Sequence, residues 1–311
     1  MFRATISTLA VSLVLSCFAA CASDDAGTSE GARASLGCVD GSLDLNVTHV
    51  DFMHDGATRS YELHLPPGYD GQTPLPVVLS FHGFTSSGPA QQVSTNMDPL
   101  ADREGFIVAY PNGIENSWNG GACCGQAAEE DLDDVGFTRA LIADLGERGC
   151  IDERRVYATG MSNGGFLSHR LACEAADVIA AVAPVAGVLG IEPEDCVPSR
   201  PIPVIHFHGT ADPLVPVEGA DSVPSVAEST EGWIERNGCS GEPRVTYEEG
   251  LATCETVDRC SDGVSVTLCL AEGAGHCWLG QPCRLPGLGE ATTDIDANEV
   301  MWELFEAHKL P

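Results

Sequence analysis

Basic side chains are scarce in this sequence. Its 311 residues include 15 Lys and Arg against 46 Asp and Glu, which gives a formal net charge of -31 at pH 7. A surface of that sign repels nucleic acid and anionic lipid, so neither is expected as a partner. A high negative charge also keeps a protein soluble outside the cell, so it does not specify a function. It does favour a neutral or weakly charged substrate over an anionic one.

The sequence also lacks an apolar run long enough to span a bilayer. The run from Leu9 to Leu15 is short, follows Arg3 and precedes small residues, which predicts a secretory signal over residues 1–21. Phe18-Ala19-Ala20-Cys21 resembles a bacterial lipobox, so plain cleavage and a lipid on Cys21 are both open. We therefore expect a secreted protein or a cell-envelope lipoprotein, with a membrane contacted only through that lipid.

Internal repeats and long linkers are absent from the rest of the chain. Residues 22–37 are small, polar and acidic, which is typical of a flexible tether. The remaining residues, 38–311, are enough for one large domain with a sizeable core. We expect that domain to be a monomer.

Metal-binding cysteine spacings are missing too. The sequence has no Cys-x-x-Cys and no zinc-finger spacing, so no metal and no cofactor is expected. All of the 14 cysteines except Cys17 and Cys21 lie beyond the signal, and their even number indicates disulfides formed in an oxidising compartment. The short separation of Cys277 and Cys283 predicts a bond between them.

Short apolar runs alternate with helical patterns along the chain. Apolar runs of this length are typical of strands covered on both faces of a parallel sheet. The expected strands are 58–65, 75–81, 106–110, 155–159, 179–186, 202–207 and 264–270, and the expected helices are 133–148, 163–175 and 294–308. This alternation predicts an α/β fold of three layers with a mostly parallel central sheet.

The spacing Gly-x-Ser-x-Gly occurs twice. At residues 160–164 it follows an expected strand and precedes an expected helix, where a sharp turn can expose a serine nucleophile. Glycine at such a turn avoids collisions with the neighbouring strand and helix. The second copy, residues 27–31, lies in the tether with neither element beside it. We therefore assign the nucleophile to Ser162 and not to Ser29.

A serine hydroxyl is a weak nucleophile, so it needs a histidine base and a carboxylate that orients the histidine. In α/β-hydrolases these follow in the order serine, acid, histidine. Asp212 comes after the strand 202–207, and His276 comes after the strand 264–270. Both therefore lie beyond strand ends in the required order.

An oxyanion hole needs two backbone amides. One is expected from Asn163, directly after the serine, and the other from Phe84, or else Thr85, in the loop after strand 75–81. His82 is expected to shape that loop.

Each motif also has a structural reading. The segment with Asp212 could be an ordinary turn, His276 could be structural, and the loop with Phe84 could be a simple join. The acidic run 129–134 is interpreted as a solvated loop leading into a helix, rather than a cation site. His206 and His208 have ligand-like alternation, but we interpret them as structural.

Two tryptophans are candidates for contacts with substrate. Trp118 could form a wall of the pocket or pack over the Cys123 and Cys124 pair, and these alternatives are equal on sequence grounds. Trp278, next but one after His276, is the second candidate.

Six segments together carry a resemblance to a known family: FHGFT, YPNGIENSWNGGACCG, DDVGF, GMSNGG, HFHGTADPLVP and GAGHCW. They resemble the secreted polyhydroxybutyrate-depolymerase-like esterases, which include feruloyl esterases, over most of residues 38–308. The resemblance implies an α/β-hydrolase fold, hydrolysis of carboxylic esters and a triad of Ser162, Asp212 and His276. Ala274 and Leu279 depart from the family's usual Gly and Pro, which affects the expected shape of the pocket.

The same resemblance bears on the substrate. Polymer depolymerases of this group usually append a linker and a binding domain, which do not follow Pro311, and residues 186–202 are short for a lipase-like lid. We expect feruloyl or acetyl esters, free or linked to plant polysaccharide, with polyhydroxybutyrate-type oligomers as the alternative. A serine peptidase of the same fold and a non-catalytic surface-binding protein are the competing classes.

Overall fold

The computed structural model describes residues 31–220, 223–283 and 286–311. The expected signal segment, Cys21 and Ser29 lie outside the described residues. Ala32–Pro311 form one compact unit.

A 10-stranded sheet forms the centre of this unit, with the strand order β1-β2-β4-β3-β5-β6-β7-β10-β9-β8. The six central strands, from β4 to β10 in this order, pair in parallel, and the two outermost strands at each edge pair antiparallel. The strands are β1 (His49–His54), β2 (Ala57–His64), β3 (Leu75–Phe81), β4 (Ile107–Pro111), β5 (Ile151–Met161), β6 (Ala181–Val185), β7 (Val204–Gly209), β8 (Arg244–Glu249), β9 (Ala252–Val257) and β10 (Val266–Ala271).

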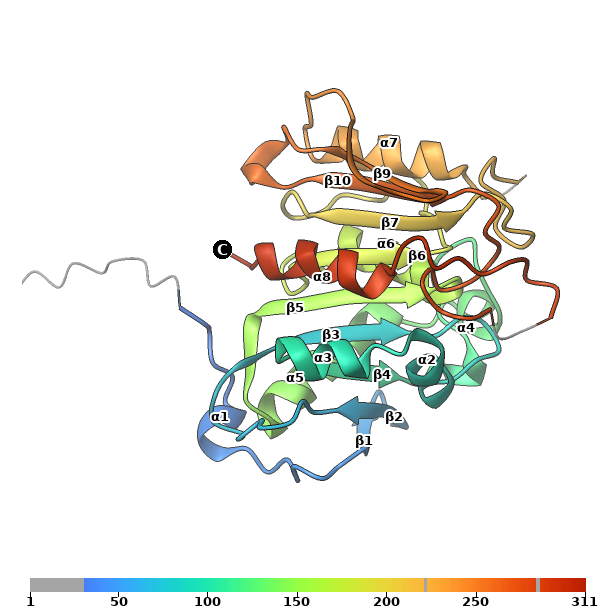
Figure 1. Cartoon of the computed structure of the whole chain (residues 1–311). Coiled ribbons are helices and arrows are strands. Elements are labelled where there is room, and N and C mark those ends of the chain that lie inside the picture. The colour runs from blue at the N-terminus through green and yellow to red at the C-terminus, as the bar shows by residue number, and fades with distance from the viewer. Residues whose placement is uncertain (1–30, 221–222, 284–285) are drawn as a thin grey trace, which may run out of the picture. The chain divides into compact units, whose positions relative to one another are not determined.

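Helices cover both faces of the sheet, so the fold has three layers (Figure 1). Helices α5, α6 and α7 lie on one face, and α3 and α8 on the other, with α2 beside α3. The helices are α1 (Gly37–Asp40), α2 (Gly88–Thr95), α3 (Asp98–Glu104), α4 (Gln126–Glu129), α5 (Asp134–Arg148), α6 (Asn163–Glu174), α7 (Val226–Arg236) and α8 (Ala297–Ala307), with short 3₁₀ turns η1 (Ile114–Asn116) and η2 (Ser261–Gly263).

The α/β class, the three layers and the mostly parallel sheet confirm the prediction from sequence. Every predicted strand and helix has a counterpart, with boundaries shifted by a few residues. The sequence reasoning missed β1, β8, β9, α1, α2, α3, α4, α7 and the two 3₁₀ turns. The edge strand β8 is mostly exposed, so it carries no continuous apolar run to reveal it.

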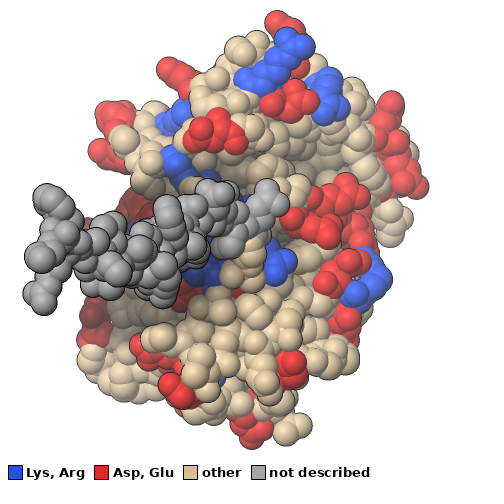
Figure 2. All heavy atoms as spheres, turned by 90° about the vertical axis from the view of Figure 1, so that its left-hand side faces the viewer, with Lys and Arg blue, Asp and Glu red and all other residues tan. Residues whose placement is uncertain are grey.

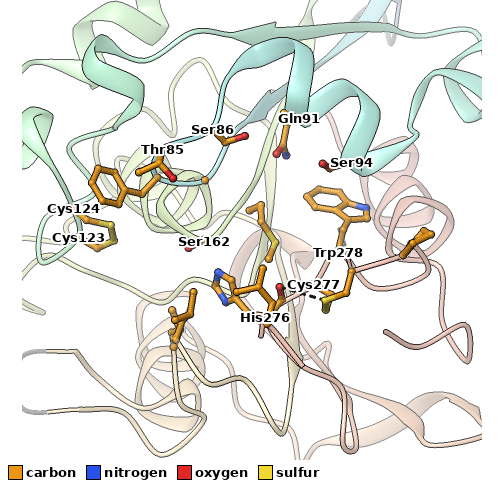
Figure 3. Close-up of a pocket in the computed structure, with 18 residues that line it drawn as sticks. Thr85, Ser86, Gln91, Ser94, Cys123, Cys124, Ser162, His276, Cys277 and Trp278 are labelled. Carbon is orange, nitrogen blue, oxygen red and sulfur yellow. Dashed lines mark hydrogen bonds between the residues drawn. A yellow bond between two sulfur atoms is a disulfide. The ribbon is translucent and has the colours of Figure 1, made fainter. Parts of the chain in front are cut away.

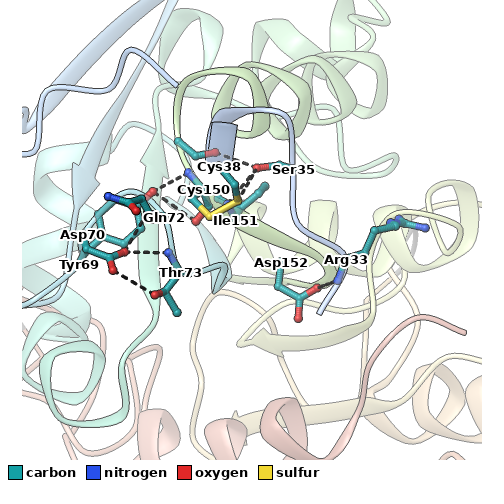
Figure 4. Close-up of a disulfide and its surroundings, with 11 residues drawn as sticks. Arg33, Ser35, Cys38, Tyr69, Asp70, Gln72, Thr73, Cys150, Ile151 and Asp152 are labelled. Carbon is teal, nitrogen blue, oxygen red and sulfur yellow. Dashed lines mark hydrogen bonds between the residues drawn. A yellow bond between two sulfur atoms is a disulfide. The ribbon is translucent and has the colours of Figure 1, made fainter. Parts of the chain in front are cut away.

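The folded body begins before residue 38, so the expected tether is too long at its C-terminal end. The Ser35 hydroxyl donates to the Gly149 carbonyl at 2.8 Å and accepts from the Ile151 amide at 3.0 Å. The Arg33 amide donates to Asp152 Oδ1 at 2.9 Å. These bonds fix the segment beside the first residues of β5 (Figure 4).

Every cysteine beyond Cys21 is paired, as the even count predicts. The pairs are Cys38–Cys150, Cys123–Cys124, Cys173–Cys196, Cys239–Cys260, Cys254–Cys269 and Cys277–Cys283. The first joins residues 112 positions apart in the sequence and ties the N-terminal segment to the start of β5 (Figure 4). The last is the pair predicted from its short separation.

The surface carries the acidic character of the composition. Figure 2 shows the side on which the central strands begin, where Asp and Glu side chains are spread widely and Lys and Arg lie beside some of them. Exposed ion pairs of the molecule include Arg33 with Glu153 and Arg139 with Asp177. Within the described ranges, none of the helices combines the length and the apolar character needed to cross a membrane.

Candidate active site

The carboxyl ends of the parallel strands lie at one edge of the sheet, opposite the side shown in Figure 2. Phe84 follows β3, Ser162 follows β5, Asp212 follows β7 and His276 follows β10. Because β7 and β10 are neighbours in the sheet, Asp212 and His276 are brought together from distant parts of the sequence.

Ser162 stands on a strained turn between β5 and α6. Its φ of 54° and ψ of -117° are unusual for a residue with a side chain, and its amide donates to Val185 O at 2.8 Å. A Cβ on Gly164 would overlap the Phe81 carbonyl, and one on Gly160 would lie 2.5 Å from the backbone of Gly164. The glycines of the motif therefore allow β5, β3 and α6 to approach closely enough to form the turn.

Asp212 and His276 form a buried hydrogen-bonded pair. His276 Nδ1 and Asp212 Oδ2 are 2.7 Å apart, and the residues are 4% and 6% exposed. The other carboxylate oxygen, Oδ1, accepts from the amides of Leu214 and Val215 at 2.8 and 2.9 Å. These contacts hold the carboxylate so that His276 carries its proton on Nδ1 and leaves Nε2 available to act as a base.

Ser162 and His276 line one cavity of about 400 Å³ (Figure 3). Among the contacts of the described residues, the Ser162 hydroxyl makes no hydrogen bond to the imidazole. Such bonds are often long in free enzymes and tighten when substrate is bound. The cavity is in the usual size range of small-molecule sites.

The amides of Asn163 and Phe84 are both available for an oxyanion. Neither has an acceptor among the described residues, whereas the Thr85 amide donates to Asn116 O at 2.8 Å. Of the two alternatives from sequence, the Thr85 amide is thus already engaged and the Phe84 amide is the one still able to donate. His82 braces this loop, because its Nδ1 donates to Gly83 O at 2.8 Å and its Nε2 accepts from the Gly113 amide at 3.0 Å.

His82 is held neutral in this role. Burial lowers its pKa to about 4, so the imidazole stays neutral at neutral pH, with its one proton on Nδ1. It does not line the cavity, in keeping with a role in shaping the loop.

Trp118 is not a wall of the cavity, so its candidacy for substrate contact is wrong. Its side chain is fully buried, and its indole N–H donates to His82 O at 3.0 Å. Its backbone amide donates to Asn163 Oδ1 at 2.7 Å, and its backbone carbonyl accepts from Asn163 Nδ2 at 2.8 Å. Trp118 therefore connects the loop that contains His82 with Asn163 at the start of α6. Trp278 does line the cavity, and its indole donates to Asn298 Oδ1 at 2.9 Å.

The acidic run before α5 is mostly exposed and leads into that helix, as interpreted from sequence, but its last residue, Asp134, is buried. Asp133 caps α5, since Oδ1 accepts from the Gly136 amide at 2.7 Å. Asp134 is 1% exposed, accepts from the Asn119 amide at 2.8 Å and lies 3.5 Å from Arg59. The run thus fixes the loop that carries Trp118.

A disulfide between adjacent residues was missed by the sequence reasoning. Cys123 and Cys124 are bonded to each other and line the cavity on one side of Ser162, with Trp278 on the other side (Figure 3). The Phe84 ring lies close to Gly125, the residue after Cys124. The adjacency of the two cysteines was the signal available in the sequence.

The described part of the chain contains no cluster of three or more His, Cys, Asp or Glu able to hold a metal ion. The side chains of His206 and His208 are buried and hydrogen-bonded to each other, so both belong to the core.

The strand order, the strained serine turn and the acid-histidine pair at adjacent strand ends define the α/β-hydrolase class of fold. Residues 59–228 match the family described as esterase PHB depolymerase. The chain belongs to this esterase family.

Individual relatives that the chain resembles are also named as esterases. Feruloyl esterase B of Piromyces equi is 34% identical over 70% of this chain, but the match covers 42% of that longer protein. Feruloyl esterase C of Emericella nidulans is 27% identical, with 80% of this chain and 84% of the relative covered. An acetyl xylan esterase from Aspergillus awamori shares the fold, with a TM-score of 0.59 and 15% identity over 83% of this chain and 98% of that one.

Proposed function

We propose that this protein is a secreted serine esterase that hydrolyses feruloyl or acetyl esters through Ser162, His276 and Asp212. The observation that carries the proposal is the Asp212–His276 bond of 2.7 Å at the cavity that also contains Ser162. Family membership supports ester hydrolysis as the reaction.

In acylation, His276 Nε2 takes the proton of Ser162 as the hydroxyl attacks the ester carbonyl. The carbonyl oxygen becomes an oxyanion that accepts from the amides of Asn163 and Phe84. These donors are fixed in place before the reaction, so they stabilise the tetrahedral intermediate more than the bound ester. Asp212 stabilises the imidazolium, which then gives its proton to the departing alcohol.

In deacylation, water replaces the alcohol. His276 takes a proton from the water as it attacks the acyl-enzyme, and the second tetrahedral intermediate uses the same two amides. Its collapse returns the proton to Ser162 and releases the acid. Each proton is transferred at Nε2, so no metal or cofactor is needed for the cycle.

The substrate assignment draws on the cavity and on the relatives. The lining of the cavity includes the apolar side chains of Met161, Leu214 and Trp278 and the polar side chains of Gln91 and Ser94. Such a lining suits an uncharged aromatic or acetyl ester better than a charged ligand. The names of relatives include feruloyl esterase and acetylxylan esterase. Polyhydroxybutyrate-type oligomers remain the alternative, because the family description names that polymer.

The decisive test of the nucleophile is Ser162→Ala. It should lower kcat for p-nitrophenyl acetate by roughly 10⁴-fold or more and abolish labelling by a fluorophosphonate, with the fold unchanged by circular dichroism. The matched control is Ser29→Ala in the second Gly-x-Ser-x-Gly copy, which should keep full activity and labelling. Normal activity in Ser162→Ala would remove the assignment.

The substrate is tested by comparing kcat/KM for methyl ferulate, acetylated xylan, hydroxybutyrate oligomers and a peptide anilide. Highest values for the first two support the proposal, and preference for the oligomers supports the alternative. Preference for the anilide would indicate a peptidase, and absence of both turnover and labelling would indicate a non-catalytic binder. The mass of the mature N-terminal peptide from cell and medium fractions tests secretion and distinguishes a lipid on Cys21 from plain cleavage.

A further inference from the structure

Three buried histidines that take no part in the proton transfers form a continuous hydrogen-bonded chain. His169 lies on α6, and His206 and His208 lie on β7; none is more than 1% exposed. The chain runs from Trp233 Nε1 to His169 Nδ1 (2.9 Å), from His169 Nε2 to His206 Nδ1 (3.3 Å), from His206 Nε2 to His208 Nδ1 (2.9 Å) and from His208 Nε2 to Val215 O (2.8 Å).

The two ends of this hydrogen-bonded chain determine which nitrogen of each histidine carries the proton. The Trp233 indole can only donate and the Val215 carbonyl can only accept. Each histidine must therefore accept at Nδ1 and donate at Nε2. A further proton on any ring would leave two N–H groups facing each other. Burial acts in the same direction, lowering the pKa of His169 to about 3 and that of His206 well below its usual range.

The donating end of the chain meets the loop that holds Asp212. The Val215 carbonyl accepts from His208, while the amide of the same residue donates to Asp212 Oδ1 at 2.9 Å. His208 Nε2 is also 3.5 Å from Asp212 Oδ2, the oxygen bonded to His276. Val215 is thus held on both sides, and its position sets the direction of the carboxylate.

We propose that Trp233, His169, His206 and His208 are positioning residues that aim Asp212 at His276 through this one-directional chain. The inference rests on the proposed function of the triad. An apolar side chain at position 208 would fill the space but leave the Val215 carbonyl without a donor, so the loop would shift. A misdirected carboxylate slows the reaction more than it weakens substrate binding, because a shift of about 1 Å can cost roughly 10²-fold in rate.

The direct test compares His208→Leu with His208→Gln, whose amide can still donate to Val215 O. Kinetics with p-nitrophenyl acetate should be expressed per active site, titrated with a fluorophosphonate. We expect kcat to fall by about 10- to 100-fold in His208→Leu, with KM changed less than about threefold. His208→Gln should recover kcat to within about fivefold of the unaltered enzyme. An unchanged kcat in His208→Leu, or equal losses in both variants, would overturn the proposal.

A milder test at the far end of the chain applies even if the His208 variants fail to fold. Trp233→Phe removes the first donor while retaining an aromatic ring. Its matched control is Trp302→Phe, since Trp302 Nε1 is buried and has no hydrogen-bond partner among the described residues. We expect kcat to fall by about 3- to 10-fold in Trp233→Phe and to stay unchanged in Trp302→Phe. Equal kcat values in the two variants would show that the chain does not position Asp212.

These outcomes are distinguishable from failure of the proposed function. If Ser162→Ala keeps its activity, the triad assignment fails and the histidine chain has no catalytic target. If Ser162→Ala is inactive while His208→Leu and Trp233→Phe turn over normally, the triad stands and the positioning proposal alone fails.

Discussion

At Asp212 the two carboxylate oxygens have separate roles. Oδ1 accepts from two backbone amides of its own loop, and Oδ2 faces His276. Burial raises the pKa of this carboxyl, but the hydrogen bonds and charge of His276, together with the amides of Leu214 and Val215, outweigh burial and leave the pKa below its ordinary value. Asp212 is therefore an acceptor at neutral pH, which fixes the tautomer of His276.

Asp212→Asn should lower kcat by about 10³- to 10⁴-fold, because an amide that donates to Nδ1 reverses the tautomer and leaves Nε2 protonated. Binding of a non-hydrolysed ester analogue should change little. The measurement is kcat at saturating p-nitrophenyl acetate, with Asp258→Asn on the surface as the control. A loss of less than about tenfold in Asp212→Asn would place the orienting acid elsewhere.

At the scale of elements, the turn from β5 to α6 depends on close contact between backbones. The strand β3 lies against β5, so the Phe81 carbonyl approaches the first turn of α6 closely at Gly164. The sequence predicted this turn because glycines, an apolar strand and a helical pattern are all local signals. It could not predict that Trp118 and Asp134 brace the turn's surroundings, because their partners come from other segments.

Gly164→Ala tests the closeness of this packing. The added methyl group should displace the turn, destabilise the fold by about 1–3 kcal/mol and lower kcat by about 10- to 100-fold. Gly241→Ala is the matched control, because a Cβ there meets only the Arg259 side chain at ordinary contact distances. Urea unfolding and kcat per titrated site measure both effects. Equal stability and kcat in the two variants would contradict this account of the turn.

At the scale of the whole molecule, the parallel sheet brings four separate loops to one edge, and disulfides fix the segments around it. Cys38–Cys150 holds the N-terminal segment against β5, and Cys277–Cys283 closes the loop that follows His276. A cross-link constrains the unfolded chain more when it closes a longer loop, so the Cys38–Cys150 bond should be the more stabilising of the two. The buried histidines add a dependence of stability on pH.

The free energy of unfolding should fall as the pH is lowered from 6.5 toward 4. His82 and His169 are buried, with pKa values lowered to about 4 and about 3, whereas an unfolded chain protonates histidine near pH 6.5. The unfolded state then binds more protons than the folded state. Between pH 6.5 and its folded-state pKa, each of these histidines lowers the free energy of unfolding by about 1.4 kcal/mol per pH unit. Urea unfolding at several pH values measures the slope. His169→Gln should have a shallower slope, and an unchanged slope would exclude this cause.

The sequence by itself determined the fold class, the serine turn and the order of the three triad candidates. These depend on local features: apolar runs, helical spacing, and glycines beside Ser162 that relieve backbone crowding. The scarcity of basic residues and the number of cysteines are likewise features of composition, and of the disulfide pairs only Cys277–Cys283 was predicted from the sequence.

Only the tertiary structure decided which groups face one another. The Thr85 amide donates to Asn116 O, the Trp118 side chain is fully buried, and Cys123–Cys124 lines the cavity. His169, His206 and Trp233 join into one chain because α6, β7 and α7 pack together. A sequence pattern records periodicity along one segment, whereas these contacts depend on the distances and angles between segments that packing alone sets.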